Sequence, residues 1–477
     1  MNSFKPMLLT SLKSYDRAQF AKDVTAGIIV AIIALPLSIA LALASGVGPE
    51  AGIFTAIVAG FVISALGGSC VQIAGPTAAF ATIVAGIVAR DGLEGLMTAT
   101  ILAGVFLIIM GFCHFGSLIK FIPYTITTGF TSGIAVTIVI GQLKDFCGVT
   151  YPDGVKPIET MEKLKAFAEN FSTISPDALI VGGVSLAILI VSPLIFKKIP
   201  GSLIAVIAGI LMVQFLPLHV STIGNLYTIS NALPTLHLPA FDMKLIQSAI
   251  PNAFTIAVLA AIESLLSCVV ADGMINSKHR SDTELIAQGA GNIASALFGG
   301  IPATGAIART AANIKNGGRT PVAGMVHSIT LVIVLVVLMP FAGMIPMPTI
   351  AAILFLVAYN MCQWRTFVHL VRTAPKSDII VLFTTFVLTV VFDLVVAIEI
   401  GMVLACLLFI KRMSEETHAD SWVYVDDDSP AVDEHLQKLP LEIRVYEITG
   451  PLFFGAADAI EHIVVKDFTK CLVLRMR

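Results

Sequence analysis

Charged residues are scarce in this chain. Only 13% of its 477 residues are Asp, Glu, Lys or Arg, whereas 56% are hydrophobic, and the mean hydropathy is +0.91. A water-soluble domain of this size would have too little polar surface to cover itself. The composition therefore excludes a soluble enzyme and predicts a protein that lies in the lipid bilayer and crosses it several times. The net charge of −3, without a basic tail, gives no reason to expect nucleic-acid binding.

Motifs for metals, disulfides and ATP are also missing. The seven cysteines are scattered, and none forms a CxxC pair or a Cys/His cluster. We therefore expect inert thiols and neither disulfides nor a structural zinc site. No Walker A motif is present, so nothing in the sequence predicts the use of ATP. The sequence implies no cofactor.

Apolar segments, in contrast, follow one another along most of the chain. Residues 76–89 and 305–316 form segments too short to cross about 30 Å of hydrocarbon at 1.5 Å per residue, so we expect half-helices there. We interpret 23–44 as a membrane span and not as a removed leader. The fourteen segments centre on 23–44, 49–66, 76–89, 95–113, 122–142, 177–195, 200–217, 249–271, 284–299, 305–316, 320–339, 348–362, 377–393 and 396–410.

The two short segments lie in similar surroundings, which indicates an internal repeat. SALGGSCVQIAGPTAAFATIVAG (64–86) and SALFGGIPATGAIARTAANIKNGG (295–318) each contain a Gly-Gly break, an extended stretch and a helix start rich in Gly, Pro or Thr. Seven segments precede Pro239 and seven follow it, and an odd number per half inverts the second copy in the membrane. We predict an all-α polytopic membrane protein with 14 transmembrane segments arranged as 7+7 inverted repeats.

The distribution of Lys and Arg predicts the orientation. If the N-terminus is cytoplasmic, most of these residues fall in cytoplasmic loops, in agreement with the positive-inside rule. We therefore expect a multi-pass protein of the cell inner (plasma) membrane with both termini in the cytoplasm.

The composition changes near the C-terminus. We expect a cytoplasmic N-terminus at 1–22, a transmembrane transport domain at 23–412, a linker at 413–440 and a cytoplasmic α/β module at 441–477. In this module IRVYEITG and CLVLRMR are typical of strands, and a helix is expected from Ala456. The pattern stops before the partners that a parallel sheet needs, so we expect an incomplete module.

The two half-helix starts predict an anion site. The first N–H groups of a helix have no intrahelical partner, and the helix dipole places partial positive charge there. Two such starts that face each other would bind an anion, glycine and alanine would allow close approach, and threonine would add a hydroxyl donor. The candidate substrate-binding residues at these starts are Pro76 and Thr77 in the first half-helix, and Thr304, Gly305 and Ala306 in the second.

Two charged residues stand out at membrane depth. Arg309 lies one turn into the second half-helix, where a charge is costly unless it faces a cavity or a partner. Anion binding is the expected role, and the alternative is an ion pair with Glu263 or hydrogen bonds to carbonyl groups. Glu263 could carry a proton, bind sodium together with Ser267 one turn later, or serve as a structural partner of Arg309. Gln72, before the first half-helix, could orient the substrate or satisfy exposed backbone.

At these residues the chain resembles the SulP family of anion transporters, the sulfate permeases whose animal relatives include pendrin and prestin. The resemblance rests on four stretches in the membrane region, and VYEITGPLFFGAADAIE resembles the opening of the family's STAS domain. The four stretches are DVTAGIIVAIIALPLSIALALASGVGPEAGIFTAIVAGFV, IAGPTAAF, AIESLLSCVVADG and ELIAQGAGNIASALFGGIPATGAIARTAANIKNGGRTPVAG.

The resemblance implies a division of labour among the spans. Spans one to four and eight to eleven would form a core that carries the substrate, and spans five to seven and twelve to fourteen a gate that dimerises or anchors it. A homodimer is therefore expected. Family binding residues correspond to Thr77, Glu263, Ser267, Gly305, Ala306 and Arg309, and residues near Pro36 to Leu41 would close the site.

The resemblance also bears on the coupling ion. Sodium-coupled bicarbonate members carry Asp and Thr where this chain has Glu263 and Ser267, and a hydroxyl residue where it has Ile307. The missing oxygen ligand favours a proton over sodium.

We therefore expect a secondary active transporter of a small anion, with sulfate as first choice, that works as a proton-coupled symporter by an elevator mechanism. A four-carbon dicarboxylate:proton symporter, a sodium-coupled bicarbonate transporter and an anion channel remain alternatives.

Overall fold

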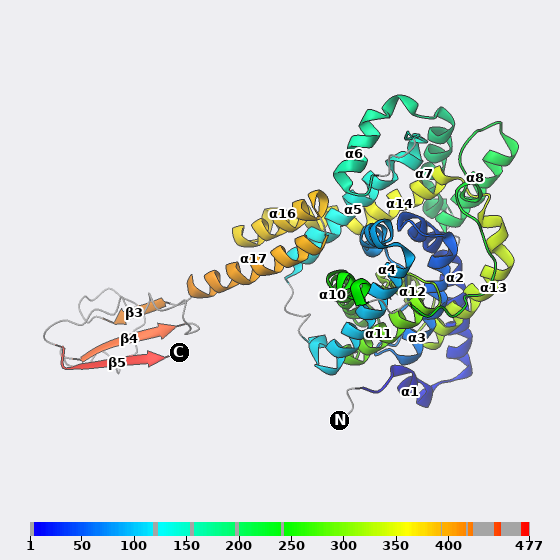
Figure 1. Cartoon of the computed structure of the whole chain (residues 1–477). Coiled ribbons are helices and arrows are strands. Elements are labelled where there is room, and N and C mark those ends of the chain that lie inside the picture. Colours follow the sequence, from blue (N-terminus) through cyan, green and yellow to red (C-terminus); the bar gives the residue numbers. More distant parts are fainter. Residues whose placement is uncertain are drawn as a thin grey trace.

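Helices make up most of the chain (Figure 1). The computed structural model describes residues 4–117, 123–152, 157–195, 200–239, 243–392, 394–415, 418–422, 443–449 and 469–476. A two-stranded sheet lies within the helical region, and a three-stranded sheet follows it. The prediction of a mostly helical, polytopic membrane protein is confirmed.

The helices of the first half of the chain are α1 (Met7–Ser11), α2 (Arg17–Ala44), α3 (Pro49–Leu66), α4 (Ala78–Phe112), α5 (Tyr124–Cys147), α6 (Thr160–Glu169), α7 (Pro176–Ile195), α8 (Gly201–Phe215) and α9 (Ile223–Leu226). Those of the second half are α10 (Met243–Ile275), α11 (Ser281–Leu297), α12 (Ile307–Lys315), α13 (Val322–Ala342), α14 (Met347–Cys362), α15 (Trp364–Thr373), α16 (Lys376–Val391) and α17 (Leu394–Glu415). The strands are β1 (Ala74–Gly75), β2 (Thr304–Gly305), β3 (His418–Trp422), β4 (Ile443–Thr449) and β5 (Cys471–Met476).

Eight helices in the described part of the chain are long and apolar enough to cross a membrane: α2, α3, α4, α5, α7, α10, α13 and the stretch Met347–Thr373 that contains α14 and α15. Each of the fourteen apolar segments coincides with a helix or with one half of α4. The count of fourteen spans itself stays a prediction.

A glycine divides α4 into two halves. Gly92 has φ 69° and ψ −167°, inside a helix that otherwise runs from Ala78 to Phe112. Glycine adopts a positive φ without steric cost, so the break occurs where the sequence allows it. The first half of α4 is thus a short helix, as predicted for 76–89.

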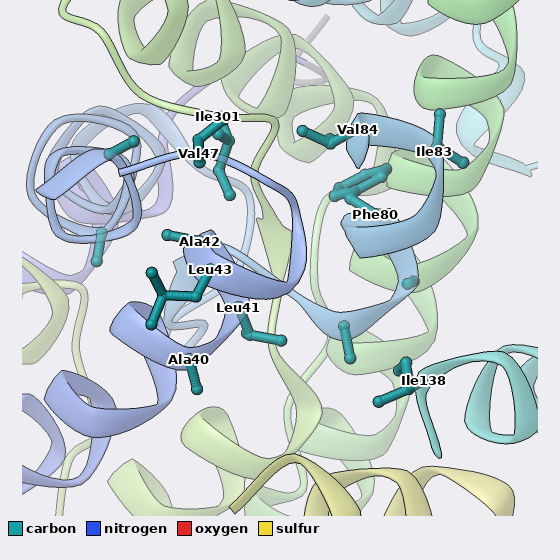
Figure 2. Packing of buried hydrophobic residues seen from close by; sticks show 14 of the residues in the cluster. Ala40, Leu41, Ala42, Leu43, Val47, Phe80, Ile83, Val84, Ile138 and Ile301 are labelled. Carbon is teal, nitrogen blue, oxygen red and sulfur yellow. The ribbon is translucent and has the colours of Figure 1, made fainter. Parts of the chain in front are cut away.

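The helices pack mainly within two groups. In the first, α4 packs on α10 and α11, and α13 packs on α2 and α3; in the second, α5 packs on α14 and α16, and α7 packs on α8 and α14. Glycines allow close crossings inside the first group: a Cβ on Gly104 of α4 would lie 2.7 Å from the carbonyl oxygen of Gly289 in α11. Figure 2 shows buried side chains of α2, such as Leu41 and Leu43, and of the first half of α4, such as Phe80 and Val84, which belong to one hydrophobic cluster.

The C-terminal sheet departs from the expected boundaries. β4 pairs with β5 in parallel, as the strand patterns suggest, but β3 lies inside the segment that we expected to be a linker and pairs antiparallel with β4. The helix expected from Ala456 lies outside the described residues. The amphipathic helices α6 and α15 were also not predicted, because each has only 10 residues and a polar face, so neither forms a continuous apolar segment in the sequence.

Candidate functional site

The two half-helices begin at one point in the structure. β1 and β2 pair antiparallel, with Ala74 opposite Gly305 and Gly75 opposite Thr304. The N–H group of Ala306 also donates to the carbonyl oxygen of Ile73 at 2.9 Å. The pairing satisfies part of the broken backbone inside the protein, which is a requirement at membrane depth. The first half of α4 and the whole of α12 lead away from this crossing.

A cavity of about 560 Å³ lies beside the crossing. Thr77, Gly305, Ala306 and Arg309 line it together with Glu263 of α10, so the structure brings both half-helix starts and both charged residues to one space. Leu37 and Leu41 of α2, from the stretch expected to close the site, form part of its apolar wall. Its other polar lining residues come from the second helix group and are Thr131, Ser202, Asn360 and Gln363.

Glu263 is tied to the first half-helix. Its Oε2 atom accepts a hydrogen bond of 3.0 Å from Thr77 Oγ1. Thr77 is the N-cap of α4, but its hydroxyl caps no backbone group of that helix. A change in the protonation of Glu263 would therefore act directly on a residue at the helix start that faces the cavity.

Arg309 is buried, with 2% of its surface exposed. Its Nη2 donates to the carbonyl oxygen of Pro76, while Nε and Nη1 have no hydrogen-bond partner among the described residues. Among those residues no salt bridge joins Arg309 to Glu263, so of the two structural alternatives only the carbonyl bond is observed. Gly75 makes room for the guanidinium, because a Cβ there would lie 2.3 Å from Nη1. A buried guanidinium with unpaired N–H groups is suited to an anion.

Three predicted site residues do not line the cavity. Thr304 Oγ1 lies 2.6 Å from Ser264 Oγ, and Ser267 Oγ donates to Thr310 Oγ1 at 3.4 Å. Gln72 is buried, and its side chain forms hydrogen bonds with Glu284 and Cys268, as described below. Successive residues of an extended strand point to opposite sides. Because Gly305 faces the cavity, its neighbour Thr304 points away from it.

Glu284 is a functional candidate that the sequence analysis missed. It is completely buried at the start of α11, and its carboxylate accepts from Gly68 N at 2.9 Å, Ser69 N at 3.2 Å, Gln72 Nε2 at 2.9 Å and Gln288 Nε2 at 2.9 Å. Cys268 Sγ donates to Gln72 Oε1 at 2.8 Å. Glu284 and Gln72 thus hold the loop before β1 in place. In the sequence, Glu284 stands out only as a carboxylate in front of an apolar segment. This pattern is also typical of an ordinary helix start, so it did not single out Glu284.

Gly305 lies directly against this network. A Cβ at Gly305 would lie 2.1 Å from Gln72 Nε2. We expect Gly305→Ala to lower the free energy of unfolding by about 1–3 kcal/mol, as overpacking does, and to reduce anion uptake. Thermal unfolding in detergent and uptake would measure both effects.

Gly183→Ala in α7 is the matched control, because a Cβ there meets nothing within 4 Å. Equal unfolding temperatures and uptake for the two alanine variants would contradict the close packing of Gln72 against Gly305.

Comparisons with known proteins show the family of the chain. The profile described as the Sulfate permease family matches residues 20–385. "Putative sulfate transporter YvdB" of Bacillus subtilis (strain 168) is 40% identical over 467 residues, which are 96% of this chain and 85% of that protein. The bicarbonate transporter BicA of Picosynechococcus sp. is 34% identical over 463 residues, covering 93% of this chain and 81% of BicA.

Solved structures show the same fold. The transmembrane domain of a cyanobacterium bicarbonate transporter BicA superposes with a TM-score of 0.72 and 30% identity, over 80% of this chain and 98% of that one. The murine Slc26a9 anion transporter in the inward-facing state has a TM-score of 0.87 at 18% identity, over 98% of this chain and 83% of that one, and this likeness concerns the fold alone. The chain therefore belongs to the sulfate permease family and is an anion transporter of the membrane, not an enzyme.

Proposed function

We propose that this chain is a secondary active transporter of a small inorganic anion, with sulfate as first choice, coupled to a proton. The observation that carries the proposal is the single cavity that both half-helix starts and the buried Arg309 share. Helix dipoles supply partial positive charge, and Arg309 supplies a full one. Apolar walls from α2 strengthen these interactions by keeping water away from the anion.

Glu263 is the proposed proton carrier. Its carboxylate lines the same cavity as the anion site and bonds to Thr77, so its charge lies close to the space that the anion occupies. A proton on Glu263 would remove the repulsion between two negative charges, which couples proton binding to anion binding. Sodium coupling has less support, because Ser267 bonds to Thr310 and does not line the cavity, and Ile307 offers no oxygen ligand.

Sulfate and bicarbonate are the substrates that the relatives favour. The Bacillus subtilis relative is named for sulfate and BicA for bicarbonate, and each is a small oxyanion that N–H donors can bind. A four-carbon dicarboxylate would suit the same donors, but no relative cited above is named for one. A channel has less support, because Glu263 gives the cavity a group that can couple two fluxes.

The two helix groups suggest how the anion moves. The first group, α2 to α4 with α10 to α13, corresponds to the core, and α5, α7, α8, α14, α16 and α17 correspond to the gate. We propose that the core carries the anion past the gate in an elevator movement, within fourteen spans and a homodimer of the plasma membrane with cytoplasmic termini. In support of this arrangement, the cavity has walls from both groups.

A substrate panel in proteoliposomes tests the proposal. Purified protein should take up labelled sulfate faster when the outside is acidic than when no pH gradient is imposed, and competition with bicarbonate and with a four-carbon dicarboxylate would rank the substrates. Uptake that follows an imposed sodium gradient and ignores the pH gradient would replace the proton with sodium. Uptake of none of these anions would contradict the proposed function.

A further inference from the structure

Helix α15 joins the apolar helices α14 and α16 and has no buried residue of its own. The stretch Met347–Thr373 is apolar enough to cross a membrane, but Gln363 interrupts it with φ 44° and ψ 43°. This left-handed conformation is uncommon for a residue other than glycine, and it ends α14, so α15 does not continue the path of α14. A short helix between two membrane segments, with one apolar and one basic side, belongs at the bilayer surface.

The protein covers only part of the apolar side of α15. The ring centroid of Phe367 lies 5.7 Å from that of Phe383 and 5.5 Å from that of Phe386, both in α16. Trp364 and Val368, in contrast, remain 46% and 37% exposed. A strip of apolar surface on α15 is therefore left uncovered by the described residues.

Basic side chains lie next to this apolar strip. Trp364, Val368 and Arg372 follow one another at intervals of four residues, so they form one row along the helix. Arg365 lies beside the row, with its guanidinium 5.7 Å from the ring centroid of Trp364. Arg365 and Arg372 are both exposed and are two turns apart on the same side, about 10 Å along the axis. One exposed side of α15 thus combines apolar and basic groups.

The charge of this region is positive. Residues 364–378 contain Arg365, Arg372 and Lys376 and one acidic residue, Asp378, which gives a net charge of +2 with histidine counted as neutral. Among the described residues no ion pair includes any of the three basic side chains.

The helices that contact α15 do not cancel this charge. Helix α5 packs on α15 and carries its only acidic residue, Asp145, near its C-terminal end, whereas Tyr124 begins the helix. Asp378 is the only acidic residue of α16 and lies in its first turn, where the partial positive charge of the helix start offsets it. The exposed arginines of α15 are therefore available to an anionic group.

The start of α15 also belongs to the transport cavity. Gln363 is the N-cap residue of α15 and lines that cavity together with Asn360 and Met361. The hydroxyl of Tyr124 donates to Gln363 Oε1 at 3.4 Å. A ligand that fixes α15 at the bilayer surface would therefore also fix one wall of the cavity.

We propose that α15 binds the headgroups of anionic phospholipids and that the bound helix holds Gln363 at the cavity wall. Trp364 and Val368 would enter the apolar edge of the leaflet, while Arg365 and Arg372 bind phosphate groups. The apolar strip beside the arginines favours a lipid over a soluble anion, which offers nothing to cover that strip. The predicted orientation places this site in the cytoplasmic leaflet. The lipid site goes beyond the proposed function, and only its effect on the cavity rests on that function.

Tryptophan fluorescence tests the site directly. The chain contains two tryptophans, Trp364 and Trp422, so Trp422→Phe leaves Trp364 as the only one. Lipids with brominated chains quench a tryptophan that they touch. In proteoliposomes of phosphatidylglycerol and phosphatidylcholine, quenching by each brominated lipid in turn should show about a fivefold or greater preference of Trp364 for the anionic phosphatidylglycerol.

Charge removal shows whether the arginines cause this preference. In the Trp422→Phe background, replacing both Arg365 and Arg372 with glutamine should lower the preference to about 1. Arg372→Gln alone should lower it at least twofold, and this variant leaves the stacking of Arg365 on Trp364 intact. Lys22→Gln is the matched control, because Lys22 is exposed on α2, in the other helix group but on the same predicted side of the membrane.

Uptake tests the effect on the cavity. In membranes that contain phosphatidylglycerol, the double glutamine variant should take up labelled sulfate at least twofold more slowly than the wild type, and in pure phosphatidylcholine the two should be equal. Comparing the two proteins in the same membrane removes the effect of the lipid charge on sulfate itself.

The outcomes separate the lipid site from the transport function. Equal quenching by both lipids, or none, would overturn the lipid site and assign the basic side to a soluble acidic partner. An unchanged preference in the double variant would also overturn it. A lipid preference with no difference in uptake would contradict the effect on Gln363. A wild type that takes up no anion in any membrane would contradict the proposed function, and the quenching would still report the lipid site.

Discussion

Replacing Arg309 with alanine should lower the apparent affinity for the transported anion by about tenfold to a hundredfold, because a charge-assisted hydrogen bond contributes about 1.5–3 kcal/mol and each 1.4 kcal/mol is about tenfold. Arg309 is one of the residues that line the cavity, and its Nε and Nη1 are buried and unpaired among the described residues. Arg309→Lys should retain part of the affinity, because lysine keeps the charge and loses the planar fork. Equilibrium binding and initial uptake rates in proteoliposomes would measure both variants.

Arg319→Ala is the matched control for the charge on α12. Arg319 lies just beyond the opposite end of this helix, where its Nη1 donates to the carbonyl oxygens of Ile314 at 2.8 Å and Gly318 at 2.7 Å. Both arginines thus bond to backbone carbonyls, but only Arg309 lines the cavity. Wild-type affinity in a folded Arg309→Ala protein would show that this arginine only holds Pro76. If Arg309→Ala and Arg319→Ala lower the anion affinity equally, both arginines have a structural role and the proposed anion contact is wrong.

Replacing Glu263 with glutamine should uncouple uptake from the proton gradient. Glutamine keeps the shape, and its carbonyl oxygen can still accept the hydrogen bond from Thr77, but the amide cannot take up a proton. We therefore expect anion binding to persist, while the ratio of uptake with an acidic exterior to uptake without a gradient falls to about 1. Counterflow exchange at equal pH would show whether the variant still moves the anion.

Glu50→Gln is the control for removing a carboxylate from this region. Glu50 lies in the first turn of α3, is partly buried and does not line the cavity. Its replacement should leave the pH-driven ratio at the wild-type value. If Glu263→Gln retains full acid-driven uptake, the proton binds elsewhere. If the wild type responds to sodium and Glu263→Gln abolishes that response, the carboxylate is a sodium ligand.

Much of the fold could be predicted because the signals are local. The scarcity of charge over long stretches predicts the membrane, and each apolar segment is long enough to specify its own helix. The breaks at 66–78 and 297–307 are also local, because glycine and proline limit helix formation wherever they stand. The half-helix starts at Thr77 and Ala306, and the exceptional positions of Glu263 and Arg309, follow from these patterns alone.

The direction of each side chain could not be predicted in this way. Gln72 and Thr77 are only five residues apart, yet Thr77 faces the cavity and Gln72 bonds to Glu284, which is 212 residues away in sequence. Thr304 and Gly305 are adjacent, and only the glycine faces the cavity. Each outcome depends on which distant helix lies beside the residue, and an extended segment can turn either face towards it.

The sequence alone determined that this protein lies in a membrane, that two helices break within it and that a carboxylate and a guanidinium at membrane depth accompany the breaks. Only the tertiary structure decided that the breaks meet through β1 and β2, and that Asn360 and Gln363 line the same cavity as the two half-helix starts. The physical reason is that helix formation and breakage depend on neighbours along the chain, whereas a cavity exists only between helices that the chain brings together from distant positions.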